Sequence, residues 1–227
     1  MRALLAGLLA LGAATPSLAG GDAPRRLSFD VFLDDRAIGY QCFELQATPG
    51  GLRVETRAEF EVKVLRITAF EYDHRNVETW RGRCLQAIDS WTSSNGKQFR
   101  VTGSAAGDGF IVAGTAGDQR LAECVGTFAY WDRRQLLGRD RLLNSQTGEF
   151  VPVTVRPLGD GVLEIGDREL RVERYAISGR ELEITLAYAV DGEEWVALDS
   201  RLDGGRMLRY RRDVTELGEP RSLAAVR

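Results

Sequence analysis

Residues 52–64 alternate between apolar and charged side chains without interruption. Every even position from Leu52 to Val64 holds an apolar residue or a threonine, and every odd position from Arg53 to Lys63 holds a charged residue. Successive side chains of a β-strand point to opposite faces, whereas a helix would distribute these charges around its whole circumference. The stretch therefore predicts a strand with one buried face and one face in water.

Short turns divide the rest of the chain into segments of similar length. Residues 49–51 (Pro-Gly-Gly) end a predicted strand at 37–47, and Asn95-Gly96 separates two runs of β-forming residues, which is typical of a tight hairpin. Strands that follow one another at intervals of about 8–12 residues indicate an antiparallel meander. The glycine-containing turns of the last third lie at 166–167, 178–180, 191–192 and 203–205.

The Asn95-Gly96 hairpin also predicts a register. Counting outward from the turn places Trp91 opposite Arg100 and Asp89 opposite Thr102. Because these side chains are charged or amphipathic, we expect them on a solvated outer face.

The segment 119–149 lacks this alternation and is rich in Leu, Phe, Tyr and Trp. Thr127 is placed to cap a short helix that runs to Leu137 and ends at Gly138. A soluble chain with ten or more strands must hide its sheet edges by curling, splitting or closing. We therefore predict an all-β fold, a curled antiparallel meander of barrel-like or sandwich form, with one short helical or irregular connection near 125–145.

The N-terminus has the parts of a secretory signal peptide. A positive start at Met1-Arg2 precedes an apolar run at 3–14, and small residues then lead to Ala19. We expect a signal peptide at 1–19, export and a periplasmic location. Residues 20–216 are then expected to form a single β-rich domain, followed by a frayed tail at 217–227.

Charge and hydropathy exclude several classes of partner. The chain carries 30 Lys and Arg against 33 Asp and Glu, a formal net charge of −3, with no long basic block. This balance argues against nucleic acid as a partner. No further long apolar segment follows the N-terminal run, so we expect no transmembrane anchor.

The three cysteines, Cys42, Cys84 and Cys124, allow at most one intrachain disulfide. Cys42 sits in the middle of a predicted strand, so we favour Cys84–Cys124. The sequence leaves all three pairings open, and any one of these cysteines can equally be a free, buried thiol.

His74 is the only histidine of the chain and lies in a predicted strand at 67–80. The period of two places its neighbours Asp73 and Arg75 on the opposite, charged face. The face with His74 is aromatic and polar, and suits either a packed sheet interior or the wall of a binding site. The candidate ligand-binding residues are Tyr72, His74, Asn76 and Trp80 on this strand, with Trp131, Asn144 and Gln146 from the irregular segment.

The motifs of several common chemistries are missing from the sequence. There is no G-x-S-x-G elbow and no C-x-x-C pair, and the glycines of 103–117 are not followed by the lysine of a phosphate-binding loop. We therefore assign no catalytic residue, no metal site and no cofactor. The favoured function is non-enzymatic binding of an apolar or lipid-like molecule, or of an envelope protein. A hydrolase or isomerase that uses His74 as acid or base, and a structural interaction module, are the alternatives.

Three stretches carry a resemblance to a known family: 72–101, the middle pieces 127–134 and 140–153, and 184–211. Together they resemble exported bacterial proteins grouped as domain of unknown function 6134, and the last stretch is distantly similar to domain of unknown function 3108. The resemblance implies an all-β envelope protein, and it carries over no catalytic residue, substrate or cofactor. Its most specific part consists of Leu142, Leu143, Asn144, Gln146, Thr147 and Gly148.

Overall fold

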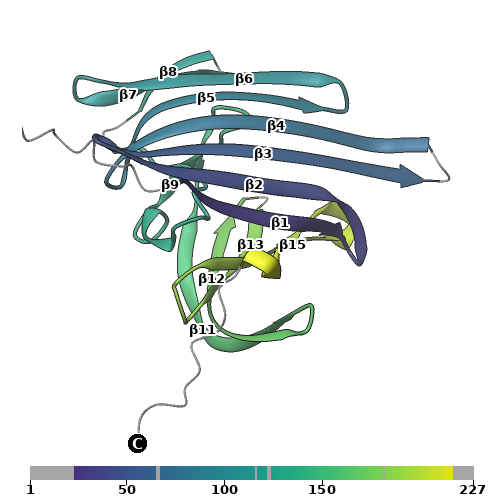
Figure 1. Ribbon diagram of the computed structural model, residues 1–227. Helices are drawn as coiled ribbons and strands as arrows, with labels where there is room; N and C mark the ends of the chain where they lie inside the picture. The colour runs from purple at the N-terminus through teal and green to yellow at the C-terminus, as the bar shows by residue number, and fades with distance from the viewer. Residues whose placement is uncertain (1–22, 65–66, 116, 122–123, 181, 217–227) are drawn as a thin grey trace, which may run out of the picture.

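The computed structural model describes residues 23–64, 67–115, 117–121, 124–180 and 182–216. The predicted signal peptide at 1–19 and the tail at 217–227 lie outside the described residues. Within the described residues, 13 strands form one antiparallel sheet in the order β11-β12-β13-β14-β15-β1-β2-β3-β4-β5-β6-β7-β8. The predicted all-β, curled antiparallel meander is confirmed, and the sheet is not closed (Figure 1).

The first β-rich part of the chain supplies eight consecutive strands. Each pairs with the next along the chain, so local hairpins build this half of the sheet. The strands are β1 (Arg25–Leu33), β2 (Arg36–Thr48), β3 (Gly51–Val64), β4 (Ile67–Arg81), β5 (Cys84–Ser94), β6 (Lys97–Ala106), β7 (Gly109–Gly114) and β8 (Gly117–Leu121).

The second part supplies five more strands and joins the first through the pairing of β15 with β1. Figure 1 shows these strands crossing below the broad layer that β1–β6 form. They are β11 (Thr154–Ile165), β12 (Arg168–Gly179), β13 (Leu182–Ala189), β14 (Trp195–Arg201) and β15 (Met207–Arg212), with 3-10 turns η2 (Asp203–Gly205) and η3 (Val214–Glu216).

The strand predicted at 52–64 is β3, and its buried face is the expected one. Val54, Thr56 and Ala58 are buried, whereas Arg57 and Glu59 are exposed. Aromatic and branched side chains on the same face of neighbouring strands complete a continuous core on the concave side of the sheet. The alternation therefore sets which face of β3 points into the molecule.

The hairpin between β5 and β6 has the predicted register. Trp91 pairs with Arg100, and Asp89 pairs with Thr102. Asn95 and the glycine after it both have positive φ, 50° and 76°, as a two-residue turn of this kind requires. On the outer face Arg100 also forms an ion pair with Asp89, at 2.9 Å.

The connection between the two parts packs against the concave face instead of spanning solvent. It contains a two-stranded sheet of β9 (Arg141–Leu143) and β10 (Phe150–Pro152), and one 3-10 turn, η1 (Arg133–Gln135). Leu136, Leu142 and Leu143 of this segment are almost fully buried. We call residues 124–149 the cover segment.

The helix predicted from Thr127 to Leu137 is wrong. The side chain of Asp132, not that of Thr127, caps the single short turn by accepting from the N–H of Arg134. Thr127 instead forms a parallel β-bridge with Leu143, and its side chain is buried. Tertiary pairing at Thr127 therefore overrides its local preference for a helix cap.

Candidate functional site

The inward face of β4 carries a row of buried polar side chains. His74, Asn76 and Glu78 are 6%, 5% and 4% exposed, whereas Arg75 between them is exposed. His74 lies opposite Ala58 of β3 and Thr92 of β5 in the register. The predicted orientation of this strand is therefore the observed one.

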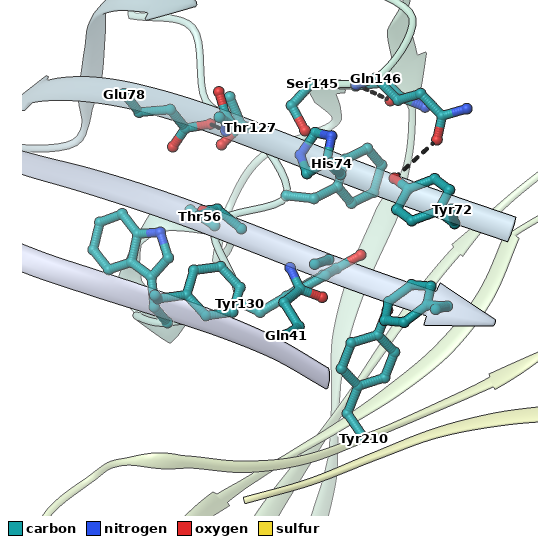
Figure 2. A pocket seen from close by; sticks show the side chains of 18 of the residues that line it. Gln41, Thr56, Tyr72, His74, Glu78, Thr127, Tyr130, Ser145, Gln146 and Tyr210 are labelled. Carbon is teal, nitrogen blue, oxygen red and sulfur yellow. Dashed lines mark hydrogen bonds between the residues drawn. The ribbon is translucent and has the colours of Figure 1, made fainter. Parts of the chain in front are cut away.

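A cavity of about 230 Å³ lies between this row and the cover segment (Figure 2). Strands β2, β3 and β4 supply its floor, β15 supplies Tyr210, β13 supplies Leu182, and the cover segment lines its other side. The lining residues are Gln41, Phe43, Thr56, Ala58, Phe60, Tyr72, His74, Asn76, Glu78, Thr127, Phe128, Ala129, Tyr130, Trp131, Asn144, Ser145, Gln146, Leu182 and Tyr210.

His74 is neutral at the floor of this cavity. Its Nδ1 lies 2.8 Å from the hydroxyl oxygen of Thr92, within hydrogen-bonding distance. Burial lowers the pKa of His74 to about 4, and the nearby charge of Asp73 opposes this shift only in part. An imidazole with such a pKa is a weak base and carries no charge at neutral pH.

Glu78 is a buried carboxyl group whose hydrogen-bond partners are all uncharged. The Asn76 amide donates to it at 3.0 Å and the Trp80 indole N–H at 2.9 Å. The Thr127 hydroxyl supplies a further hydrogen bond from the cover segment. Burial raises the pKa of Glu78, and these hydrogen bonds counteract part of that shift.

Two buried oxygens beside Glu78 have no hydrogen-bond partner among the described residues. They are Oδ1 of Asn76 and the hydroxyl oxygen of Ser90. Asn76 and Ser90 are direct partners in the register of β4 and β5. A buried polar atom without a partner costs about 1–3 kcal/mol. The row on β4 and its neighbour on β5 therefore contain hydrogen-bonding capacity that no described residue uses.

The walls of the cavity are aromatic. The rings of Phe60 and Tyr72 stack with their centroids 5.2 Å apart, and Tyr210 meets Phe60 edge-on at 6.1 Å. Tyr130 and Trp131 enter from the cover segment, as Figure 2 shows for Tyr130. Such rings provide a large apolar contact area with few polar atoms.

A turn of the cover segment places Gln146 over the row. The side-chain oxygen of Asn144 accepts from the backbone N–H groups of Gln146 and Thr147, at 2.8 Å and 3.3 Å. Gln146 in turn accepts a hydrogen bond from the Tyr72 hydroxyl at 3.2 Å. This turn falls within the most specific part of the family resemblance, so the motif serves to bring the cover segment against β4.

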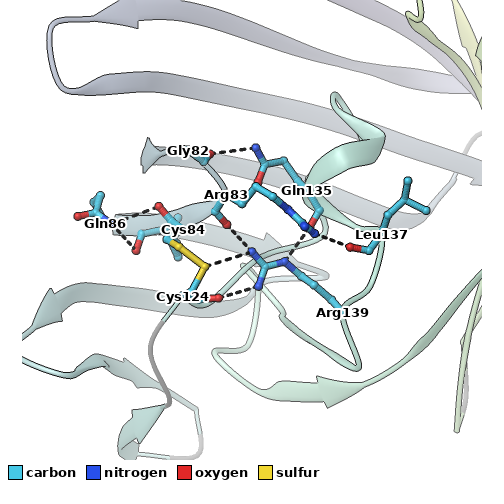
Figure 3. The surroundings of a disulfide bond; sticks show 9 residues. Gly82, Arg83, Cys84, Gln86, Cys124, Gln135, Leu137 and Arg139 are labelled. Carbon is cyan, nitrogen blue, oxygen red and sulfur yellow. Dashed lines mark hydrogen bonds between the residues drawn. A yellow bond between two sulfur atoms is a disulfide. The ribbon is translucent and has the colours of Figure 1, made fainter.

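A disulfide holds the start of the cover segment to β5. Cys84 and Cys124 are bonded, as Figure 3 shows. Cys124 adopts a φ of 58°. The guanidinium group of Arg139 donates to the carbonyl oxygens of Cys124, Gln135 and Arg83. Cys42 is free and buried. The structure thus contains the pair that we favoured from the sequence.

The cover segment also contacts strands β12 and β13 and the turns that follow β7 and β13. The Tyr188 hydroxyl of β13 donates to the carbonyl oxygen of Tyr130 at 2.8 Å, and Thr115 donates to Thr147 O through its backbone and its hydroxyl, both at 2.9 Å. Arg133 forms ion pairs with Glu173 and with Glu193. These contacts hold over the cavity a segment that is distant in sequence from its floor.

Six of the seven candidate residues line the cavity, and Trp80 does not. The Trp80 ring instead packs edge-on against Trp131, with centroids 5.6 Å apart, while its indole N–H binds Glu78. Trp80 therefore contacts two lining residues without lining the cavity itself.

Several lining residues lie outside the seven candidates predicted from the sequence. Glu78 shares the two-residue period of His74, and Thr56 shares that of residues 52–64. The alternation in the sequence therefore indicated that both side chains point inward. No local pattern marks the other main additions, which are Gln41, Tyr130, Ser145 and Tyr210.

His74 lines the cavity together with Glu78 and Ser145. Its side-chain hydrogen bond is to Thr92, a hydroxyl group on the neighbouring strand. Across the described residues, no group of three or more His, Cys, Asp or Glu side chains is arranged to hold a metal ion. The described part of the chain also contains no helix of the length and apolarity needed to cross a membrane.

Fold and cavity together define an all-β protein with one open, curled antiparallel sheet and a pocket on its concave side. The chain belongs to the family described as Domain of unknown function (DUF6134), whose model matches residues 29–213. The resemblance to domain of unknown function 6134 is thereby confirmed.

A solved structure is similar in fold. It is the crystal structure of a beta-barrel-like protein of Domain of Unknown Function DUF1849 from Brucella abortus, at 12% identity and a TM-score of 0.58, covering 84% of this chain and 95% of that chain. At this identity the likeness concerns the fold alone. The comparison with curated proteins finds no match to this chain.

Proposed function

We propose that this protein is exported to the periplasm and binds an apolar or lipid-like molecule in the cavity under the cover segment, without catalysing a reaction. The observation that carries the proposal is the cavity itself, in which aromatic walls from three parts of the chain converge over a polar floor. Ligand sites of proteins are typically concave, largely apolar and supplied with a few placed polar groups.

The size of the cavity limits what it can hold. Typical pockets for drug-sized ligands measure about 300–1,000 Å³, and a cavity of about 150 Å³ is enough for benzene. A cavity of about 230 Å³ suits a short apolar molecule or the end of an alkyl chain. A complete lipid would need to leave most of its length outside.

The state of His74 favours binding over catalysis. A general acid or base works best with a pKa near the operating pH, and burial holds the pKa of His74 at about 4. The hydrogen bond between Nδ1 and the Thr92 hydroxyl further restrains the ring. We therefore assign His74 to the floor of the site, because a pKa of about 4 makes it a poor base for the hydrolase or isomerase alternative.

Two features support export. The order of charge, apolar run and small residues at 1–19 is that of a cleavable signal peptide. The disulfide between Cys84 and Cys124 is a type of bond that persists mainly in oxidising compartments such as the periplasm.

The test uses the full chain, expressed with its N-terminus and purified from a bacterial periplasm. Native mass spectrometry looks for a bound molecule, and tryptophan fluorescence follows titration with octanol, octanoate and octylamine, with glucose as a polar control. We expect saturable fluorescence changes with alkyl compounds alone. Trp131→Phe removes most of that change because Trp131 lines the cavity, whereas Trp91→Phe, on the outer face, preserves it. Absence of any bound molecule and of any alkyl response would contradict the proposal.

A further inference from the structure

We propose that the molecule recognised by this cavity carries a cationic amine on an apolar body, with Glu78 and Asn76 receiving the ammonium group. The inference rests on the binding function proposed above and adds the chemical class of the head group. It follows from the charge of the lining, from its unused acceptors and from its aromatic walls.

The charge of the lining has one sign. Glu78 is the only carboxyl group among the described lining residues, His74 is neutral, and these residues include no lysine or arginine. A buried carboxylate without a cationic partner is costly, and proteins normally pair such a group or neutralise it. Burial accordingly raises the pKa of Glu78. A bound cation would pair with the carboxylate and remove this cost.

The acceptors at the floor match an ammonium group. A carboxylate has about four acceptor positions, and Glu78 receives hydrogen bonds from Asn76, Trp80 and Thr127. Beside it, Oδ1 of Asn76 is a buried acceptor without a partner among the described residues. An ammonium group offers three donors and no acceptor, so it matches a floor whose remaining positions are acceptors. A carboxylate or phosphate head would oppose acceptor to acceptor and bring a second negative charge.

The aromatic walls favour the same class of ligand. A cation near the face of a Trp, Tyr or Phe ring is attracted by the ring quadrupole, and aromatic cages commonly recognise organic cations. Phe60, Tyr72, Tyr130 and Trp131 all line the cavity around the polar row. Their rings also give the apolar body of the ligand its contact surface.

Three compounds of matched chain length distinguish this inference from the function on which it rests. Octylamine, octanol and octanoate are titrated into the wild-type protein at neutral pH, with affinity taken from tryptophan fluorescence and calorimetry. A charged hydrogen bond is worth about 1.5–3 kcal/mol, so octylamine should bind about ten-fold or more tightly than octanol, and octanoate weakest. If none of the three binds, the binding function fails. If octanol or octanoate binds as tightly as octylamine, the function stands and the amine inference is overturned.

Glu78→Gln keeps the volume of the side chain and removes its charge. We expect its affinity for octylamine to fall about ten-fold or more while its affinity for octanol stays within about two-fold. A second variant, Phe128→Leu, removes a half-buried lining ring. It should fold even if Glu78→Gln does not, and it then tests the inference in its place. It should weaken octylamine more than octanol, whereas the matched control Phe150→Leu, outside the lining, changes neither. Equal effects on the two ligands in the variants would overturn the inference.

Discussion

The imidazole Nδ1 of His74 and the hydroxyl oxygen of Thr92 lie 2.8 Å apart, on paired strands at the floor of the cavity. This pairing joins the single histidine of the chain to β5, and burial leaves the ring uncharged. Because the neutral state is required by burial, His74 links the stability of the fold to pH.

The pH dependence contributed by His74 has a definite sign. Its folded pKa of about 4 lies below the ordinary value of 6.5, so the unfolded state binds more protons between these values. The free energy of unfolding should therefore fall as pH decreases from 6.5 to 4, by about 3 kcal/mol from this group. Denaturant unfolding of the wild type and of His74→Gln across this window measures the difference. Parallel curves for the two proteins would show that the histidine is not the cause.

Glu78 should act in the opposite direction. Its folded pKa is raised above the ordinary 4.5, so the folded state binds more protons than the unfolded state from that value upward. The contribution of Glu78 to the free energy of unfolding should therefore decrease as pH rises through this window, and Glu78→Gln should lack that contribution. Glu59→Gln, an exposed residue on β3, serves as the control and should follow the wild type. A Glu78→Gln profile with the wild-type slope would rule out a raised pKa.

The disulfide should stabilise both the fold and the position of the cover segment over the cavity. Cys84 and Cys124 are separated by 40 positions, and closing a loop of this length is worth about 4 kcal/mol in the chain-entropy description. The double variant Cys84→Ser/Cys124→Ser should lose much of that stability and bind alkyl ligands more weakly, because the start of the cover segment is released. Thermal unfolding and ligand titration measure the two effects. Cys42→Ala leaves the disulfide in place, so equal ligand loss in that variant would argue against a specific role for the bond.

Gly114 of β7 should be essential to seating the cover segment. A Cβ atom at this position would lie 2.6 Å from Thr147 O and 2.8 Å from the Cα of Gly148, so the turn would have to move. We expect Gly114→Ala to destabilise the protein by about 1–3 kcal/mol, as overpacking commonly does, and to weaken ligand binding. At Gly50, an added Cβ meets no atom within 4 Å. Denaturant unfolding of Gly114→Ala and Gly50→Ala compares the two, and equal stability would contradict this assignment.

The proposed export predicts a defined mature N-terminus. Cleavage after Ala19 would leave Gly20 as the first residue, which intact-mass measurement of periplasmic protein detects. Ala19→Arg, which places a large charged residue at the cleavage position, should cause the precursor to accumulate, whereas Gly21→Ala should be processed normally. An uncleaved wild-type protein in the cytoplasm would exclude the export proposal.

Much of the sheet follows from short-range patterns. The alternation at 52–64 and around His74 assigns inner and outer faces because a strand reverses its side chains at each residue. Asn95-Gly96 sets the register of β5 with β6 because both residues accept positive φ. These features depend on backbone sterics within a few residues, and the sequence contains all that they require.

The tertiary structure alone decided how the two β-rich parts meet and what covers the row. The pairing of Phe29 on β1 with Arg212 on β15 joins positions from opposite ends of the chain, and no local pattern specifies it. The burial of Thr127 beside Glu78, and the approach of Gln146 to Tyr72, likewise depend on packing between distant segments. Long-range contacts of this kind are selected by the burial of apolar surface in the whole molecule, which a period of two residues does not encode.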